Sequence, residues 1–312
     1  MVWRSAGISW RGGVPALRWE GGRVSALAYG RDMAFRAVGE RRCPGARGNA
    51  CPLTAVLPGR STGGRCPECA RLDRAHSVAA DTVADDPRTY RVYLAWFGPG
   101  MVKVGITAEE RGDARLLEQG AVAFSWLGRG PLMAARRTEE VLRHALAVPD
   151  RIPYARKRAV RHALPPAAER AAEVAELYER AVGVPAWAET LHALPCQVRD
   201  HVEVFRLEAL AQPGLTPSAR SSSELVATEL VVTECVDGGV LAGRLVAAAG
   251  PDLHLLGPDG RPLVLDTRLL TGWELVAAPA GHAVTVPLAS GVAAPATADP
   301  SSGRADGQES LF

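Results

Sequence analysis

Residues 92–121 read VYLAWFGPGMVKVGITAEERGDARLLEQGA, and this stretch decides the fold of the central part of the chain. An apolar run that carries Tyr93 leads into a Gly-Pro-Gly turn, and a second apolar run ends at Gly105. Two apolar runs around a glycine turn predict a β-hairpin. A polar segment that holds Arg115 follows, and it predicts a helix behind the hairpin.

The amino-acid composition is typical of a folded protein with a hydrophobic core. Hydrophobic residues make up 47% and charged residues 22% of the 312 positions, which is enough for two or three compact domains. The formal net charge is +2 and by itself indicates no partner. Lysine occurs only at positions 103 and 157 among 36 basic residues, so the arginine content reflects a compositional bias more than nucleic-acid binding.

The sequence lacks the segments that direct a chain into a membrane or out of the cell. It has no apolar run of about 18 residues, the length that a transmembrane helix needs. The first twenty residues lack the continuous apolar stretch of a secretory signal. We therefore expect a cytoplasmic protein without a membrane partner. Thiols stay reduced there, so clustered cysteines indicate metal ligands before disulfides.

Four cysteines lie in a segment rich in glycine and proline, and they predict a structural zinc site. Cys66 and Cys69 form the pattern CPEC, in which two thiolates can bind one tetrahedral ion. Cys43 and Cys51 are spaced too widely for a standard zinc knuckle, but a loop can bring both to the same ion. Two alternatives are a redox-active CPEC pair and the replacement of one cysteine by His76. A zinc ion with four thiolates would stabilise the fold and not act in catalysis.

The order of patterns along the chain predicts an α+β protein. EGGR at 20–23 and GPDGRP at 257–262 predict hairpin turns near the two ends. The apolar spacing of 133–148 and the span from proline to glycine at 165–183 predict helices between them. The predicted parts are a strand-rich segment 1–42, a zinc-binding region 43–80, a sheet-and-helix module 88–165, a helical region 166–212, a linker 213–224, a C-terminal β segment 225–279 and a disordered tail 280–312.

The two ends of the chain also resemble each other weakly. Residues 17–35 and 253–273 both give a strand, a glycine turn and a second strand. One explanation is that any two hairpins look alike. The other is that the two strand pairs share one sheet or barrel across the ends of the chain.

The hairpin, followed by RRTEEVLRHAL at 136–146, resembles the core of the GIY-YIG nuclease superfamily. The string VKVGIT, a following arginine, QGA and the segment LLTGWELV resemble more closely the uncharacterised bacterial family called domain of unknown function 2797. That family also carries cysteines upstream of the hairpin. The resemblance covers roughly residues 5–277 and implies a GIY-YIG-like module at 88–165.

The resemblance implies which residues would form a site that hydrolyses phosphodiesters. Tyr93 takes the place of the first tyrosine, and Gly105 that of the glycine in the second motif. Arg115 takes the place of the arginine on the following helix. Glu140 takes the place of the glutamate, with the adjacent Glu139 as the alternative equivalent.

Each of these side chains would have a role in cutting a phosphodiester bond. Glu140 would hold one magnesium ion that neutralises the scissile phosphate, and Arg115 would bind a phosphate oxygen. Tyr93 would take or relay a proton from water, for which its pKa must fall from about 10. The second tyrosine of the superfamily is missing, and Lys103 stands nearest to its place. Lys103 would either lower the pKa of Tyr93 or pair with Glu140 and block the metal.

A basic stretch lies next to this predicted site. Residues 129–162 carry nine basic residues against three acidic ones. The pattern favours contact with a nucleic-acid backbone, and the alternative is a solvated basic helix. The residues expected to contact nucleic acid are Arg136, Arg137, Arg156, Lys157, Arg158 and Arg161.

Three functions are compatible with these patterns. The first is a nucleic-acid-binding protein with a magnesium-dependent, endonuclease-like site. The second is a non-catalytic, zinc-containing nucleic-acid-binding module in which Lys103 contacts phosphate in place of the second tyrosine. The third is a protein-interaction scaffold, for which the sequence gives no positive feature.

Overall fold

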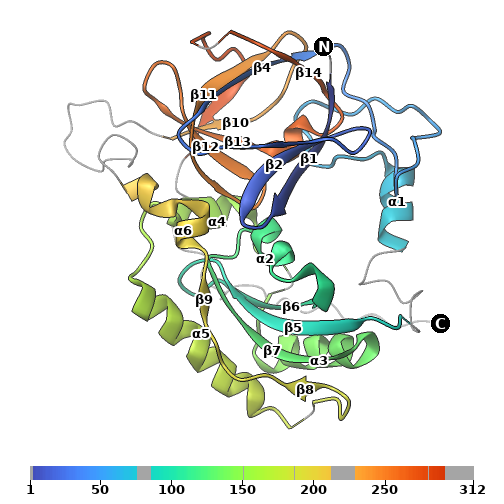
Figure 1. Ribbon diagram of the computed structural model, residues 1–312, viewed down its shortest axis with the longest axis vertical. Helices are drawn as coiled ribbons and strands as arrows, with labels where there is room; N and C mark the ends of the chain where they lie inside the picture. The colour runs from blue at the N-terminus through green and yellow to red at the C-terminus, as the bar shows by residue number, and fades with distance from the viewer. Residues whose placement is uncertain are drawn as a thin grey trace, which may run out of the picture.

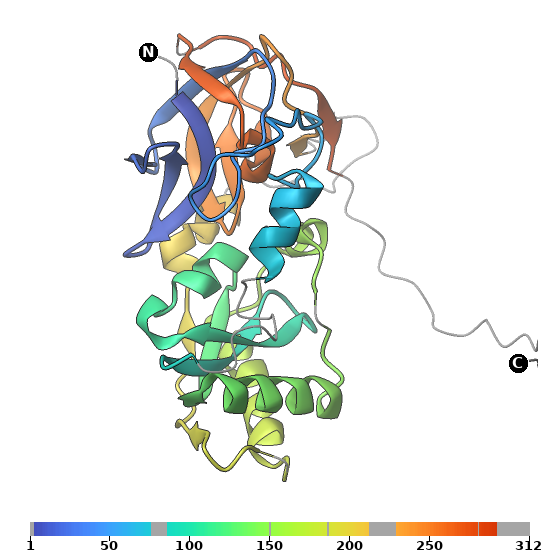
Figure 2. The ribbon, with the colours of Figure 1, turned by 90° about the vertical axis from the view of Figure 1, so that its right-hand side faces the viewer.

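The quoted hairpin lies in the lower half of the molecule as drawn in Figure 1. The structure is a computed structural model that describes residues 3–75, 86–149, 151–185, 187–211, 229–279 and 281–291. In this part of the chain one half contains a ten-stranded sheet, and the other contains a five-stranded sheet with helices packed on it (Figure 1, Figure 2). The predicted α+β class is confirmed.

The smaller sheet is built around the predicted hairpin. Strand β5 (Thr89–Trp96) pairs antiparallel with β6 (Val102–Ala108) on one side and with β7 (Ala123–Pro131) on the other. Two short strands, β8 (His192–Ala193) and β9 (Arg199–Asp200), add to β7. The region predicted as helical after residue 166 therefore also contains two strands, a correction that long-range pairing with β7 explains.

The register of the hairpin places four residues on one face of this sheet. Tyr93 lies opposite Gly105, and Ala95 lies opposite Lys103. Directly paired residues and residues two apart in a strand point to the same face. Gly100 closes the turn with a φ of 65°, a conformation that glycine adopts without strain.

Helices cover both faces of the smaller sheet. Helix α3 (Leu132–Ala145) and helix α5 (Ala167–Val182) contribute to the main core together with Val92 and Leu94 of β5. On the other face Leu116 packs with Tyr93 in a second, smaller core. Leu116 belongs to α2, which runs from Ala114 to Gln119, and α4, which runs from Tyr154 to Val160, adds Val160 to the same core.

The larger sheet contains strands from both ends of the chain. Its order is β15-β10-β13-β12-β11-β4-β14-β1-β2-β3. The strands from the N-terminal end are β1 (Trp3–Arg11), β2 (Val14–Trp19), β3 (Val24–Ala26) and β4 (Asp32–Val38). The strands from the C-terminal end are β10 (Leu230–Val232), β11 (Val240–Ala249), β12 (Asp252–Leu256), β13 (Pro262–Asp266), β14 (Glu274–Ala277) and β15 (Leu288–Ser290).

The two ends of the chain form one sheet and not two separate units. Strand β4 pairs with both β11 and β14, and β14 also pairs with β1, where Trp3 lies opposite Leu275. In Figure 1 the blue and the orange strands accordingly lie together in the upper half. Of the two explanations for the weak echo between residues 17–35 and 253–273, the structure therefore shows the shared sheet.

The predicted hairpins near the two ends of the chain can be compared with the strands of the larger sheet. The hairpins at EGGR and GPDGRP are confirmed as β2–β3 and β12–β13. Strand β15 pairs with β10, so the predicted disordered tail is wrong for its first part. The predicted linker 213–224 and the end of the tail after residue 291 lie outside the described residues.

The remaining elements are short. They are α1 (Pro67–Ala75), η1 (Glu109–Arg111), α6 (Val202–Phe205), η2 (Leu207–Ala211) and η3 (Thr267–Leu270). Figure 2 shows α1 running from the half with the larger sheet towards the other half. In the part of the chain that the structure describes, no helix is both long and apolar enough to cross a membrane.

Candidate active site and metal centre

The four cysteines of the predicted zinc site converge on one point. Their Sγ atoms all lie within 4.8 Å of one another, and the four residues are buried. The Sγ atoms of Cys51 and Cys66 lie 3.7 Å apart. The backbone N–H of Cys66 also donates to the Sγ of Cys43 across 3.3 Å, which stabilises a thiolate. Four thiolates at this spacing fit a tetrahedral zinc ion.

The local sequence explains how widely spaced cysteines reach the same point. A tight loop between Cys43 and Cys51 is closed by backbone hydrogen bonds of 3.0 Å between Ala46 and Asn49. Gly45 in this loop has a φ of 84°, and a Cβ there would overlap the backbone of Asn49. Cys66 directly precedes α1, and Cys69 lies in its first turn. The alternative ligand His76 lies outside the described residues.

The candidate catalytic tyrosine lies deep in the smaller half. Tyr93 is 1% exposed, and its ring packs against Gly105, where a Cβ would overlap the ring and the hydroxyl. The side-chain Nε2 of Gln119 at the end of α2 donates a hydrogen bond of 2.9 Å to the hydroxyl oxygen. The absence of a side chain at Gly105 is therefore what allows the phenol to occupy this place.

Two charged side chains act on this phenol. Burial raises the pKa of Tyr93, because the ionised form loses its solvation. The nearby Arg115 guanidinium and the hydrogen bond from Gln119 oppose that rise, whereas the Glu139 carboxylate adds to it. The structure thus brings Tyr93, Gly105 and Arg115 together, with Glu139 near enough to act on the same oxygen.

Glu140 points elsewhere on α3. Its carboxylate lies 2.6 Å from the Arg143 guanidinium and 3.3 Å from a ring nitrogen of His144, and the side chain is 60% exposed. The hydrogen bond with Arg143 lowers the pKa of Glu140. Glu140 therefore interacts with Arg143 and His144, whereas Glu139, the alternative left open by the sequence, is the one whose charge acts on Tyr93, because a helix turns about 100° between neighbouring residues.

Lys103 shares the face of Tyr93 but acts on another lysine. It is half-buried, and its charge is among the causes that lower the pKa of Lys157. Burial is the largest cause and the charge of Arg161 the second, and with that of Lys103 they lower the pKa of Lys157 to about 7. The Nζ of Lys157 lies 3.7 Å from the centre of the Phe97 ring and donates a hydrogen bond of 3.0 Å to the Gln119 carbonyl.

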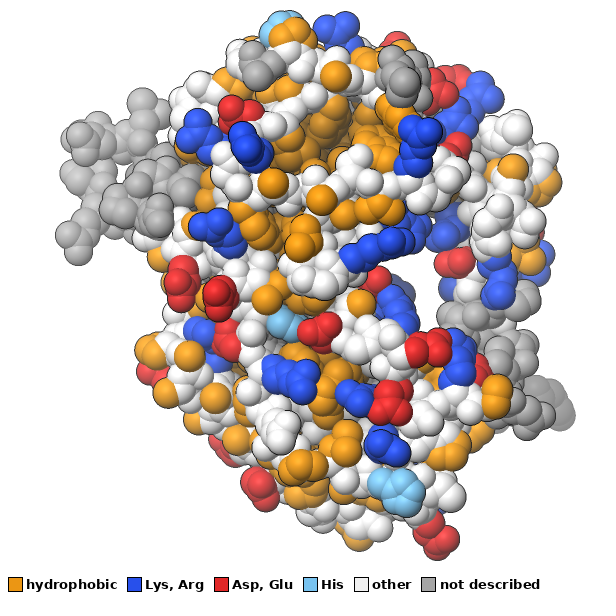
Figure 3. All heavy atoms as spheres, viewed as in Figure 1, with side chains coloured by type: hydrophobic (Ala, Val, Ile, Leu, Met, Phe, Trp, Pro, Cys, Tyr) orange, Lys and Arg blue, Asp and Glu red, His pale blue; other side chains and the backbone are white. Residues whose placement is uncertain are grey.

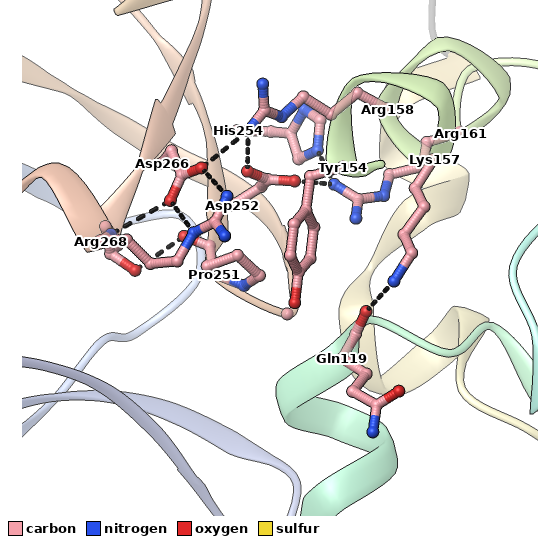
Figure 4. Close-up of polar contacts among 12 residues, drawn as sticks. Gln119, Tyr154, Lys157, Arg158, Arg161, Pro251, Asp252, His254, Asp266 and Arg268 are labelled. Atoms are coloured by element: carbon pink, nitrogen blue, oxygen red, sulfur yellow. Dashed lines mark hydrogen bonds and ion pairs between the residues drawn. The ribbon is translucent and has the colours of Figure 1, made fainter. Parts of the chain in front are cut away.

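Three basic residues on and directly after α4 are largely buried. Lys157 and Arg161 are 4% and 2% exposed, and the side chain of Arg158 is 15% exposed. Arg158 lies 2.8 Å from Asp252 and 2.9 Å from Asp266, and Arg161 lies 2.8 Å from Asp252. Figure 4 shows these contacts between α4 and the larger sheet. The prediction that these three residues bind nucleic acid is wrong, because they pair within the protein.

Helix α4 also holds the end of α2. The Tyr154 hydroxyl lies 3.5 Å from the Glu118 carbonyl, next to the contact between Lys157 and the Gln119 carbonyl. The Tyr154 ring is placed between two cations, 4.5 Å from the Lys157 Nζ and 4.3 Å from the Arg268 guanidinium (Figure 4). The larger sheet therefore supports, through α4, the helix that carries the residues around the phenol.

A second polar cluster escaped the sequence analysis. Glu229 Oε1 lies 3.0 Å from His162 Nε2 and 3.2 Å from His254 Nδ1, and the three residues form a group that can hold a metal ion. Arg161 faces His254 Nε2 at 3.3 Å and only donates, so the proton of neutral His254 sits on Nδ1 and points to Glu229. In this arrangement both imidazoles contact the Glu229 carboxylate through hydrogen bonds. His162, Glu229 and His254 lie far apart in the sequence, so no motif with a regular spacing predicts that they meet.

These features define an α+β protein with a buried four-cysteine cluster and a polar site around one phenol on its smaller sheet. The chain belongs to the family described as Protein of unknown function (DUF2797), whose model matches residues 30–275. The match spans the cysteines, the smaller sheet and the central strands of the larger one, and it leaves out β1, β2, β3 and β15. Neither the curated proteins nor the solved structures include a match to the chain.

Proposed function

We propose that the protein binds nucleic acid and hydrolyses phosphodiester bonds at the site around Tyr93, in the manner of GIY-YIG-like nucleases. The observation that carries the proposal is the set of groups around one oxygen. A buried phenol lies over Gly105, accepts a hydrogen bond from Gln119 and is influenced by the charges of Arg115 and Glu139. A phenolate can act as a general base, a guanidinium can offset charge on a phosphate, and a carboxylate can hold a magnesium ion.

In the proposed hydrolysis Tyr93 is the general base and Arg115 stabilises the phosphate. Ionised Tyr93 takes a proton from water, and the resulting hydroxide attacks phosphorus. The bond from phosphorus to the leaving oxygen then breaks, and that oxygen takes a proton from solvent. Arg115, whose side chain is 46% exposed, offers a guanidinium to the phosphate from the solvent side. It offsets the charge that builds up on the phosphate oxygens.

Glu139 fits the role of a magnesium ligand. Glu139 is half-buried on α3 and its charge acts on the phenol, and Mg²⁺ in phosphate chemistry is commonly held by one or two carboxylates together with substrate oxygens and water. Magnesium bound at Glu139 would supply a Lewis acid for the phosphate.

Part of the predicted basic surface supports binding of a polyanion, although with fewer residues than the sequence predicted. Arg137 and Arg156 are exposed and Arg136 is half-buried, so these three of the six predicted contacts can reach a phosphate backbone. Figure 3 shows an opening between the two halves with Lys and Arg side chains along its edge. Binding through such contacts should weaken steeply as salt rises.

Cleavage assays with matched variants test the proposal. Purified protein is incubated with labelled single- and double-stranded DNA and RNA in magnesium or in EDTA. We expect cleavage in magnesium that falls at least about 100-fold in Tyr93→Phe, since a general base contributes about that much or more. Glu139→Gln should lose cleavage, whereas Glu140→Gln on the same helix should keep it. Cleavage that persists in Tyr93→Phe and Glu139→Gln would refute this site.

One observation favours the second function, a non-catalytic nucleic-acid-binding module. Tyr93 is 1% exposed and burial raises its pKa, which opposes proton transfer at neutral pH. On this proposal the site binds a phosphate through Arg115 without cutting it. Salt-sensitive binding without cleavage in any metal, reduced by Arg115→Met and unchanged by Tyr93→Phe, would support the module.

A further inference from the structure

Gln119 connects the candidate phenol to the framework of the molecule. It is 8% exposed, and its side-chain amide donates to the Tyr93 hydroxyl oxygen across 2.9 Å. It lies in the string QGA at the end of α2, to which the sequence assigned no chemical role. Because this buried amide contacts the oxygen that would react, it can influence the ionisation of Tyr93.

The backbone of Gln119 is fixed from two sides. Its carbonyl accepts a hydrogen bond of 3.0 Å from Lys157, which reaches it from α4. The following residue, Gly120, ends α2 with a φ of 71°. There the chain lies so close to the turn between β11 and β12 that a Cβ on Gly250 would come within 3.0 Å of the Gly120 nitrogen. The amide of Gln119 therefore reaches Tyr93 from a fixed starting point.

We propose that Gln119 is a positioning residue that directs the Tyr93 hydroxyl proton and stabilises the ionised phenol. The inference rests on the proposed function. An amide N–H that donates to the phenol oxygen uses one of its acceptor sites, so the phenol's own proton must point away from Gln119. When that proton leaves, the hydrogen bond gains a charged acceptor and becomes roughly twice as strong. Gln119 thus favours the form of Tyr93 that accepts a proton from water.

Ionisation of Tyr93 can be followed without any cleavage assay. The chain has five tyrosines, and 3-fluorotyrosine in their place gives a fluorine resonance that moves when each phenol ionises. The resonance of position 93 is the one that disappears in Tyr93→Phe. In Gln119→Met, which lacks the amide, we expect the ionisation constant of Tyr93 to fall about tenfold. The resonance would then titrate at higher pH.

Two more variants make the result specific. Gln119→Glu keeps the shape of the side chain but has no N–H, and its charge opposes a phenolate, so the ionisation constant should fall further than in Gln119→Met. It also serves as the test if Gln119→Met does not fold. Gln197→Met changes an exposed glutamine elsewhere and should leave the Tyr93 resonance where it is. An unchanged ionisation constant in folded Gln119→Met or Gln119→Glu would overturn the proposal.

Cleavage by the same preparations separates this inference from the proposed function. In an active enzyme, Gln119→Met should move the rise of rate with pH towards higher pH, which a purely structural role would not do. If Gln119→Met is active and its pH profile matches that of the wild type, the role of Gln119 is refuted but the proposed function is not. A shifted Tyr93 resonance in a protein that never cleaves would refute the proposed function and leave the effect of Gln119 on the phenol established.

Discussion

Arg161 on α4 donates a hydrogen bond of 2.8 Å to Asp252 at the start of β12, and this contact joins the two halves of the protein. Both side chains are at most 1% exposed. Two charges in such a place are compensated only by each other and by their remaining partners. Loss of Arg161 leaves the fully buried Asp252 with Arg158 at 2.8 Å as its remaining cation, and removing one member of such a buried group costs far more than an exposed ion pair contributes.

The first prediction concerns this contact. Arg161→Met should lower the free energy of unfolding by about 3–5 kcal/mol, because Asp252 keeps its charge but loses a buried partner. Urea unfolding followed by tryptophan fluorescence measures the change. Arg244→Met is the control, since Arg244 and Asp32 form a pair at 3.4 Å with side chains 58% and 60% exposed. That control should change stability by less than about 1 kcal/mol. Equal effects of the two substitutions would contradict the assigned role of Arg161.

The second prediction concerns the cysteine cluster. The purified protein should contain one zinc ion per chain, and Cys69→Ser should lose it. The free energy of unfolding should then fall by more than about 3 kcal/mol, since zinc contributes on the order of 10 kcal/mol to small zinc domains. Elemental analysis and thermal unfolding with and without a chelator measure both effects. Cys196→Ser, which removes a thiol away from the cluster, should keep the metal. A metal-free protein purified under reducing conditions would exclude the zinc site.

The third prediction concerns the glycine beneath the phenol. Gly105→Ala should destabilise the protein by about 1–3 kcal/mol, because its Cβ would overlap the fully buried Tyr93 ring. It should also displace the hydroxyl from Gln119 and reduce any cleavage. Gly183→Ala is the control: its φ is −73°, and its Cβ would meet other atoms at 3.4 Å and 3.6 Å, an ordinary contact. If Gly105→Ala unfolds in urea like the wild type, the packing of Tyr93 on Gly105 is not as described.

Local chemistry explains which parts of the fold could be predicted from the sequence. The turns at 20–23 and 257–262 specify hairpins through residues within the turns themselves. Helix α5 begins after Pro166 and is followed by Gly183, as the sequence indicated. The pairing of β4 with β11 and β14 could not be predicted, because an alternating apolar pattern says that a strand has a buried face but not which strand lies beside it.

In the candidate site, too, local patterns could be predicted from the sequence and long-range contacts could not. The hairpin register brings Tyr93 to Gly105, and both residues were singled out from the sequence. The choice between Glu139 and Glu140 depends on the rotation of α3 against the sheet, which no local pattern determines. The basic residues of α4 were misinterpreted for a related reason. Their charge is visible in the sequence, but the carboxylates of Asp252 and Asp266 that neutralise it lie about 90–110 residues away and meet them only after folding.

The fourth prediction concerns pH and the cluster around Glu229. Burial opposes ionisation of His162, yet the hydrogen bond to Glu229, the charge of Glu229 and the contact with the Leu210 carbonyl together raise its pKa above the ordinary 6.5. A histidine whose pKa is raised by folding contributes stability that is fully present below about pH 6.5 and is lost as pH rises through the folded pKa. The difference in unfolding free energy between wild type and His162→Gln should therefore be larger at about pH 5.5 than at about pH 9, by roughly 1–2 kcal/mol.

Urea unfolding of the two proteins across this pH range measures that difference. Burial lowers the pKa of His254, which acts in the opposite direction, but this residue is present in both proteins. The control is His144→Gln, since His144 is 67% exposed and its partner Glu140 is 60% exposed. Its effect should stay within about 0.5 kcal/mol at every pH, as expected for a surface substitution. A His162→Gln difference that grows towards alkaline pH would show that His162 is neutral in the folded protein. The hydrogen bond to Glu229 would then come from the single N–H of a neutral imidazole, placed on Nε2.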